Sequence, residues 1–114
     1  MSYFESYQQT VFFNPDTLCI PGVTEIYDVY TANYLSTRNY TLFVTVQDID
    51  TSVVVRLEGS VDGVNFGALI SNTIIENGTY AYNVSGFPVR KVRANFLKET
   101  GGNSARVTFK IAAN

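Results

Sequence analysis

The fold is decided by the run Val53-Val54-Val55-Arg56-Leu57-Glu58 and by the alternating segments that follow it as far as residue 112. An apolar side chain occupies every second position of this run, which is the two-residue period of a strand with one buried face. We expect Val53, Val55 and Leu57 to point inward, and Val54, Arg56 and Glu58 to point outward.

The same alternation recurs before and after this run. The residues expected to point inward are Tyr40, Leu42, Val44 and Val46, then Tyr80, Tyr82 and Val84, then Val92, Ala94 and Phe96, and finally Val107, Phe109 and Ile111. Turn sequences at Asp62-Gly63, Asn77-Gly78 and Gly101-Gly102 separate the later segments. Because a short polar turn joins 41–48 to 53–58, we expect these two segments to pair as an antiparallel hairpin. The fold class is all-β: an antiparallel β-sandwich of about eight or nine short strands, for which a jelly roll is one possible form.

Length and composition fit one domain that folds without disulfide bonds. The chain has 114 residues, of which 46% are hydrophobic, and its 16 aromatic residues are all Phe or Tyr. Cys19 is the only cysteine, so no disulfide can form within the chain. We assign 9–114 to a single sandwich domain and 1–8 to an N-terminal arm. This arm contains Tyr3, Phe4 and Tyr7, and it is either a first edge strand or a segment that lies on a neighbouring subunit.

The sequence offers little for catalysis or cofactor binding. Histidine is absent, which removes the commonest general base and the commonest zinc ligand. No Gly-rich phosphate loop occurs, and the carboxylates of Asp48 and Asp50 belong to a polar turn where we expect them to be solvated. We therefore expect no enzyme activity, no catalytic residues, no cofactor and no metal.

The sharpest local feature is the segment Ser60-Val61-Asp62-Gly63-Val64-Asn65. An Asp-Gly turn uses the positive φ that Gly allows, and the Asp carboxylate can accept hydrogen bonds from the amides of the turn itself. The alternative is a calcium site built from Asp62, Asn65, Asp48 and Asp50, although their spacing lacks the pattern of an EF-hand loop.

Charge divides the chain unequally. Between residues 89 and 110 six basic residues face one acid, Glu99, for a net charge of +5, whereas the remainder carries two basic residues and nine acids, for −7, which together give the overall −2. By the alternation, we expect a basic stripe across one sheet face. A chain that is acidic overall would be repelled by nucleic acid, so this stripe favours a protein partner. The predicted partner-binding residues are those of the arm, Tyr3, Phe4 and Tyr7, together with Arg90, Lys91, Arg93, Arg106 and Lys110.

The central signals resemble those of small β-sandwich virion proteins of tailed bacteriophages. The resemblance covers about half of the chain, and its motifs are Val55-Arg56-Leu57-Glu58-Gly59-Ser60-Val61-Asp62-Gly63-Val64-Asn65-Phe66, Asn77-Gly78-Thr79-Tyr80, Pro88-Val89-Arg90-Lys91-Val92-Arg93 and a Gly-Gly turn before a terminal strand. It implies a capsid decoration or cement protein that binds the major capsid protein or another virion protein as a homo-oligomer, with a trimer favoured. The resemblance also implies a place in the virion, assembled in the host cytoplasm. The sequence is compatible with this, since it starts without a signal-peptide pattern and has no apolar run long enough for a membrane span.

A weaker similarity to discoidin-like sugar-binding sandwiches gives the alternative function. In that reading the chain is a carbohydrate-binding module of a fibre or cell-surface protein. Phe66 stands where those relatives usually carry Trp, and this chain has no Trp. Exposed Tyr rings would then have to form the sugar platform.

Overall fold

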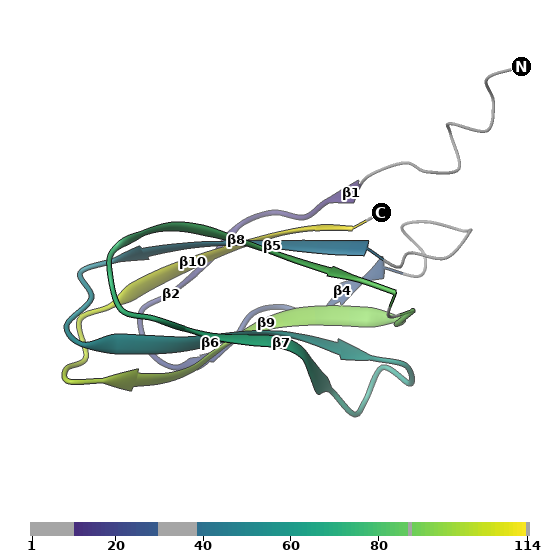
Figure 1. The fold of residues 1–114 in the computed structure, drawn as a ribbon. Coiled ribbons are helices and arrows are strands. Elements are labelled where there is room, and N and C mark those ends of the chain that lie inside the picture. The colour runs from purple at the N-terminus through teal and green to yellow at the C-terminus, as the bar shows by residue number, and fades with distance from the viewer. Residues whose placement is uncertain (1–10, 30–38, 87, 114) are drawn as a thin grey trace, which may run out of the picture.

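The computed structural model describes residues 11–29, 39–86 and 88–113. These residues form ten strands in two layers, as Figure 1 shows. In the described part of the chain no helix has the length and apolar character that crossing a membrane requires. The strands are β1 (Val11–Phe12), β2 (Asp16–Leu18), β3 (Gly22–Val23), β4 (Tyr27–Asp28), β5 (Asn39–Gln47), β6 (Ser52–Ser60), β7 (Gly67–Ile74), β8 (Gly78–Ser85), β9 (Lys91–Thr100) and β10 (Arg106–Ala113).

Each of the two layers is an antiparallel sheet. Sheet A has the order β1-β10-β5-β8, with β2 also pairing with β10, and sheet B has the order β3-β9-β6-β7, with β4 also pairing with β9. When β1 with β2, and β3 with β4, are each counted as one interrupted strand, eight strands fill the two sheets in the order of a jelly roll. The predicted antiparallel sandwich is confirmed, and it takes the jelly-roll form.

The core lies between the two inner sheet faces and follows the predicted alternation. Every residue expected to point inward from β5, β9 and β10 is buried, as are Val53, Val55 and Leu57 of β6. On β8, Val84 is buried while Tyr80 and Tyr82 are half-buried against the core, because β8 is an edge strand. The largest fully buried side chains are Tyr40, Phe96 and Phe109.

The expected hairpin between 41–48 and 53–58 is wrong. Strand β5 pairs with β10 and β8 in sheet A, whereas β6 pairs with β7 and β9 in sheet B. The polar turn between them, which includes Asp48 at a φ of 56°, carries the chain from one layer to the other. Both strands thereby turn their apolar faces toward the same core from opposite layers. The Gly101-Gly102 turn likewise joins β9 to β10 across the two sheets.

The pairing of the chain with β9 is interrupted between β3 and β4. The Thr24 backbone N–H donates to the Ala94 carbonyl at 2.9 Å, and the Thr24 hydroxyl accepts the Ala94 N–H at 3.0 Å. Because a side-chain oxygen replaces a backbone carbonyl as the acceptor, regular pairing stops and resumes only at β4. The edge of sheet B beside β9 is therefore made of two short pieces.

Candidate partner-binding surfaces

The predicted partner-binding residues do not form one site. Tyr3, Phe4 and Tyr7 lie outside the described residues. Arg90 precedes β9, and its side chain is exposed. Lys91 and Arg93 lie on β9 in sheet B, whereas Arg106 and Lys110 lie on β10 in sheet A.

The expectation of one basic stripe is wrong. Arg93 points away from the core on β9, and Arg106 and Lys110 point away from the core on β10, but these strands belong to opposite layers. Their side chains consequently lie on opposite outer faces of the sandwich. Alternation correctly predicts the side of each strand on which these residues lie, but β9 and β10, which are consecutive in the sequence, are not neighbours in one sheet.

Two of the predicted cations are engaged within the molecule. Arg93 Nε donates to Glu58 Oε1 at 2.8 Å, and the guanidinium carbon lies 4.1 Å from the centre of the Phe66 ring. The Lys91 ammonium lies 3.9 Å from an Asp28 carboxylate oxygen. These contacts, the first of which combines an ion pair with a cation–π interaction, hold the side chains against sheet B.

Glu58 points outward from sheet B as expected, but it is buried there. Only 6% of Glu58 is exposed, although it shares the outer side of sheet B with its register partner Arg93. Its second carboxylate oxygen accepts a hydrogen bond from Asn95 Nδ2 at 2.9 Å. The side chains of Arg93 and Asn95 therefore cover the carboxylate to which they donate hydrogen bonds. This cluster has the geometry of a structural ion pair.

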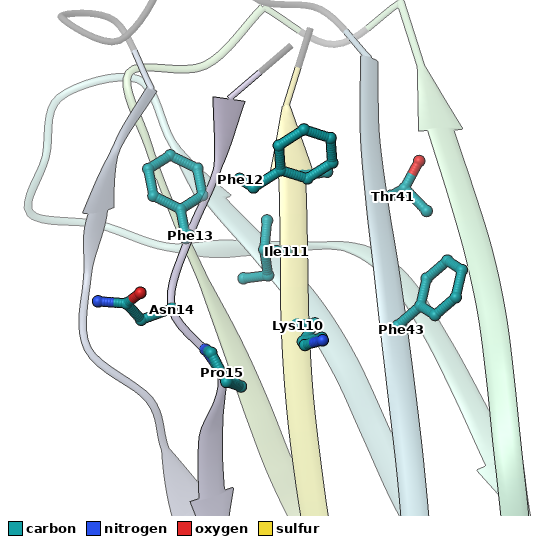
Figure 2. A pocket seen from close by; sticks show the side chains of 9 residues that line it. Phe12, Phe13, Asn14, Pro15, Thr41, Phe43, Lys110 and Ile111 are labelled. Atoms are coloured by element: carbon teal, nitrogen blue, oxygen red, sulfur yellow. The ribbon is translucent and has the colours of Figure 1, made fainter.

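The outer face of sheet A carries an open groove of about 670 Å³. Figure 2 shows Phe12 in front of β10, Phe43 on β5, and Lys110 between Pro15 and Phe43. Phe12 is 77% exposed and Phe43 is 44% exposed, so two aromatic rings face solvent here. The lining residues are Phe12, Phe13, Asn14, Pro15, Thr41, Phe43, Lys110, Ile111 and Ala112.

One wall of the groove is fixed by contacts that span the two sheets. The Phe13 ring stacks on the Tyr27 ring of β4, with ring centres 4.8 Å apart, and the Tyr27 hydroxyl donates to the Asn14 carbonyl at 3.2 Å. Burial, with smaller contributions from the negative charges of Asp16 and Glu25, raises the pKa of Tyr27 above its usual value. The wall is therefore formed before any partner arrives.

A second hollow of about 400 Å³ extends the groove along sheet A, and the two share Pro15, Phe43 and Lys110. Two residues along β5 from Phe43, a row of four threonines in register crosses β2, β10, β5 and β8. In order across the sheet they are Thr17, Thr108, Thr45 and Thr79. The hydroxyls of Thr17 and Thr108 are hydrogen-bonded at 2.9 Å, and those of Thr45 and Thr79 at 3.1 Å. This face thus presents aromatic rings and mutually paired hydroxyls, with Lys110 in the groove and Arg106 near one end.

This groove is not predicted by the sequence. The two-residue period places Phe43 on the outward side of its strand, but no local pattern connects it with Phe12. The two rings are brought onto one face because β1 and β5 flank β10 from opposite sides. An exposed Phe within an alternating strand was the only local signal.

The Ser60–Asn65 turn forms as expected. Asp62 Oδ1 accepts hydrogen bonds from the Ser60 hydroxyl and from the backbone N–H groups of Val64 and Asn65, each at 2.8 Å. The Asn65 side-chain amide donates to the other carboxylate oxygen, also at 2.8 Å. These bonds, first of all those from the Asn65 and Val64 amides, hold the pKa of Asp62 far below its usual range.

The alternative calcium site cannot form from the residues proposed for it. Asp48 and Asp50 precede β6, whereas Asp62 and Asn65 follow it. A nine-residue strand such as β6 spans about 30 Å, so the two groups lie at opposite ends of the sandwich. Within the described residues no three acidic or cysteine side chains gather as metal ligands would.

The sugar-binding alternative required exposed Tyr rings. Tyr40 is buried, and Tyr27, Tyr80 and Tyr82 are half-buried, so the described tyrosines form no open platform. Burial raises the pKa of Tyr82 above its usual value, and the neighbouring Tyr80 makes a smaller contribution in the same direction. The exposed aromatic rings of the described chain are Phe12 and Phe43.

Comparison with known proteins identifies a shared fold. The crystal structure of SPBc2 prophage-derived protein YomS matches 93% of this chain and 92% of its own, with a TM-score of 0.57 and 13% sequence identity. A structure of Bacillus endospore appendages, which form a family of disulfide-linked pili, covers 92% of this chain and 88% of its own at 18% identity, but its TM-score of 0.40 supports no inference. No family model matches the sequence, and no curated protein does. This chain therefore has a fold similar to that of a prophage-derived protein.

Replacing Glu58 will test whether the buried ion pair is structural. We expect Glu58→Ala to lower the free energy of unfolding by about 2–3 kcal/mol, because Arg93 and Asn95 lose their acceptor. Glu58→Gln should cost about half as much, since its amide oxygen still accepts one of these bonds. Urea denaturation provides the measurement, with Glu76→Ala as the matched exposed control. Equal losses for Glu58→Ala and Glu76→Ala would contradict the interpretation.

Acid will weaken the Asp62 turn. Because the folded-state pKa lies below the ordinary value of about 4, the carboxylate contributes stability that is complete above about pH 5 and is lost as the pH falls further. Asp62→Asn lacks this titration, so the stability difference between native protein and variant should be largest near neutral pH and should shrink toward about pH 2. Urea unfolding of both proteins at each pH measures it. A difference that stays constant with pH would show that the charge of Asp62 does not matter.

Proposed function

We propose that the protein is a non-enzymatic structural protein of a phage virion, acting as a capsid decoration or cement protein. Its contact surface in this proposal is the outer face of sheet A, which binds the major capsid protein or another virion protein. The observation that carries the proposal is the pair of solvent-facing rings, Phe12 and Phe43, on either side of an open groove.

The chemistry of this face suits a protein partner. Exposed apolar surface bordered by polar side chains is typical of interaction sites, and aromatic residues are enriched in the buried centre of such interfaces. Rings carried by paired strands lose little conformational freedom on binding. The hydroxyls of Thr45 and Thr79 share one hydrogen bond, so covering the pair leaves a single O–H donor for the partner to satisfy.

Arg106 and Lys110 add an electrostatic component on the same side. Both are exposed on β10, and Lys110 lies within the groove. Opposite an acidic patch of a capsid subunit, these charges would set the orientation and accelerate docking. Arg90, Lys91 and Arg93 are not part of the proposed contact, because they lie on or directly before β9 in the opposite layer.

The cement role is inferred from the rigidity of the fold and from the interface area that each contact would add. A jelly roll with a densely packed core can bridge neighbouring subunits without deforming, and each contact adds interface that resists expansion of the lattice. The motif resemblance and the fold shared with a prophage-derived protein support a phage context. Homo-oligomerisation and contacts from Tyr3, Phe4 and Tyr7 remain part of the proposal.

Removing the two exposed rings should abolish attachment to particles. We expect Phe12→Ser with Phe43→Ser to reduce affinity for the particle by more than about tenfold, because these rings are the apolar centre of the contact. Occupancy would be counted as copies per purified particle. The control is Val61→Ser with Val64→Ser, which removes two exposed apolar side chains from the β6–β7 loop. Native occupancy of the Phe variant, with circular dichroism confirming its fold, would refute the proposed surface.

Charge reversal on β10 should weaken attachment in a salt-dependent way. Arg106→Glu with Lys110→Glu is expected to slow association by about tenfold at low ionic strength and less at high ionic strength. Arg90→Glu with Lys98→Glu makes the same change in net charge at exposed sites outside sheet A. Binding kinetics on immobilised particles provide the measurement. Identical kinetics for both variants would eliminate the electrostatic part of the proposal and leave the apolar part standing.

A further inference from the structure

The two flanks of the sandwich differ in how their sheet edges are protected. On one flank the edges consist of β1 to β4, each two or three residues long. Pro15 separates β1 from β2, and Pro21 precedes β3. Asp16 and Asp28 add negative charge within β2 and β4. Short strands, prolines and charges are devices that prevent edge strands from pairing with other chains.

The opposite flank has none of these devices. It is formed by β7 in sheet B and β8 in sheet A, each eight residues long and, among the described residues, paired on one side only. Neither strand contains a charged residue or a proline. Strand β8 keeps one unbroken register with β5 along its whole length, from Asn39 opposite Ser85 to Val46 opposite Gly78.

The core is also incompletely covered on this flank. Ile70 of β7 and Tyr80 and Tyr82 of β8 pack against the core but remain half-buried. Ile75, in the turn between the two strands, is 69% exposed. On the protected flank, by contrast, the stacked rings of Phe13 and Tyr27 close the gap between the sheets. A further strand beside β8 would bury the open apolar surface and satisfy the backbone groups that face outward from the edge.

We propose that β8 pairs antiparallel with β8 of a second copy of this chain across a two-fold axis, which joins two copies of sheet A into one continuous sheet. A second copy is the occupant that this strand fits, because an antiparallel pair of identical strands is self-complementary. The absence of charge matters here, since any charged side chain near the axis would face its own copy.

Side-chain direction limits the register. A continuous sheet keeps inward side chains on one side, so Tyr80, Tyr82 and Val84 must face inward residues of the partner strand. This leaves two central registers, with either Ala81 or Tyr82 opposite its own copy. In the first, Thr79 faces Asn83 of the second copy, and in the second, Ala81 faces Asn83. Both registers juxtapose small uncharged residues on the outer face.

This pairing does not depend on the proposed virion role. It can be tested without particles, and the groove variants should still pair. Because it is two-fold, it predicts a dimer, or an assembly built from dimers, in place of the trimer that the sequence resemblance favoured.

Two acidic residues on β8 should separate the copies. Ala81→Glu with Asn83→Glu places like charges directly opposite each other in at least one position of either register, so we expect the dissociation constant to rise by more than about tenfold. The control, Asn39→Glu with Gln47→Glu, adds the same charge at exposed positions of the interior strand β5. Sedimentation velocity across the micromolar range, at physiological salt, measures the association. The native protein and the control should dimerise, and the β8 variant should remain a monomer.

Hydrogen exchange of the native protein provides an independent test if the variant does not fold. The amides of β8 should exchange more slowly as protein concentration rises, whereas those of β1 and β2 should not change. The inference is overturned if the native protein is monomeric across the range, if the β8 variant dimerises like the control, or if exchange in β8 is independent of concentration.

Discussion

The packing of two inner sheet faces against each other is the constraint on which the rest of the structure depends. Leu42 and Val44 of sheet A share one buried cluster with Leu57, Phe96 and other apolar residues of sheet B. Neither sheet could bury its apolar face alone, so the chain must fill both layers at once. The polar turn before β6 therefore crosses between layers, and sequential strands from β5 onward pair in the same sheet only at β6 and β7.

That connectivity separates residues that are close in the sequence. The basic residues of β9 and β10 come from one short segment, but they are distributed between opposite faces. On sheet B, Arg93 is bound to Glu58 and covers Phe66, which makes that part of the face a closed structural cluster. On sheet A, Lys110 lies among exposed aromatic and hydroxyl groups. The two outer faces thus have different chemistry although both belong to a regular sandwich.

The surfaces left for partners are those that the core packing does not use. The outer face of sheet A has a groove with its wall fixed by Phe13 and Tyr27, and the flank of β7 and β8 has two unprotected edges. A face recognises its partner through side chains, whereas an edge does so mainly through backbone hydrogen bonds. The two surfaces can therefore serve different contacts, and a substitution in one need not disturb the other.

The sequence by itself determined which residues form the core and where the Asp62 turn lies. Both are local properties: a strand's two faces follow from its two-residue period, and a turn is specified by residues that are neighbours in the chain. Tertiary structure alone decided which strands pair, why Glu58 is buried, and that Phe12 and Phe43 flank one groove. The reason is that these features join residues distant in the sequence, and strand pairing depends on how the whole chain distributes its apolar faces between two layers. An alternating strand carries the information for its own two sides, but it does not specify which strand lies next to it.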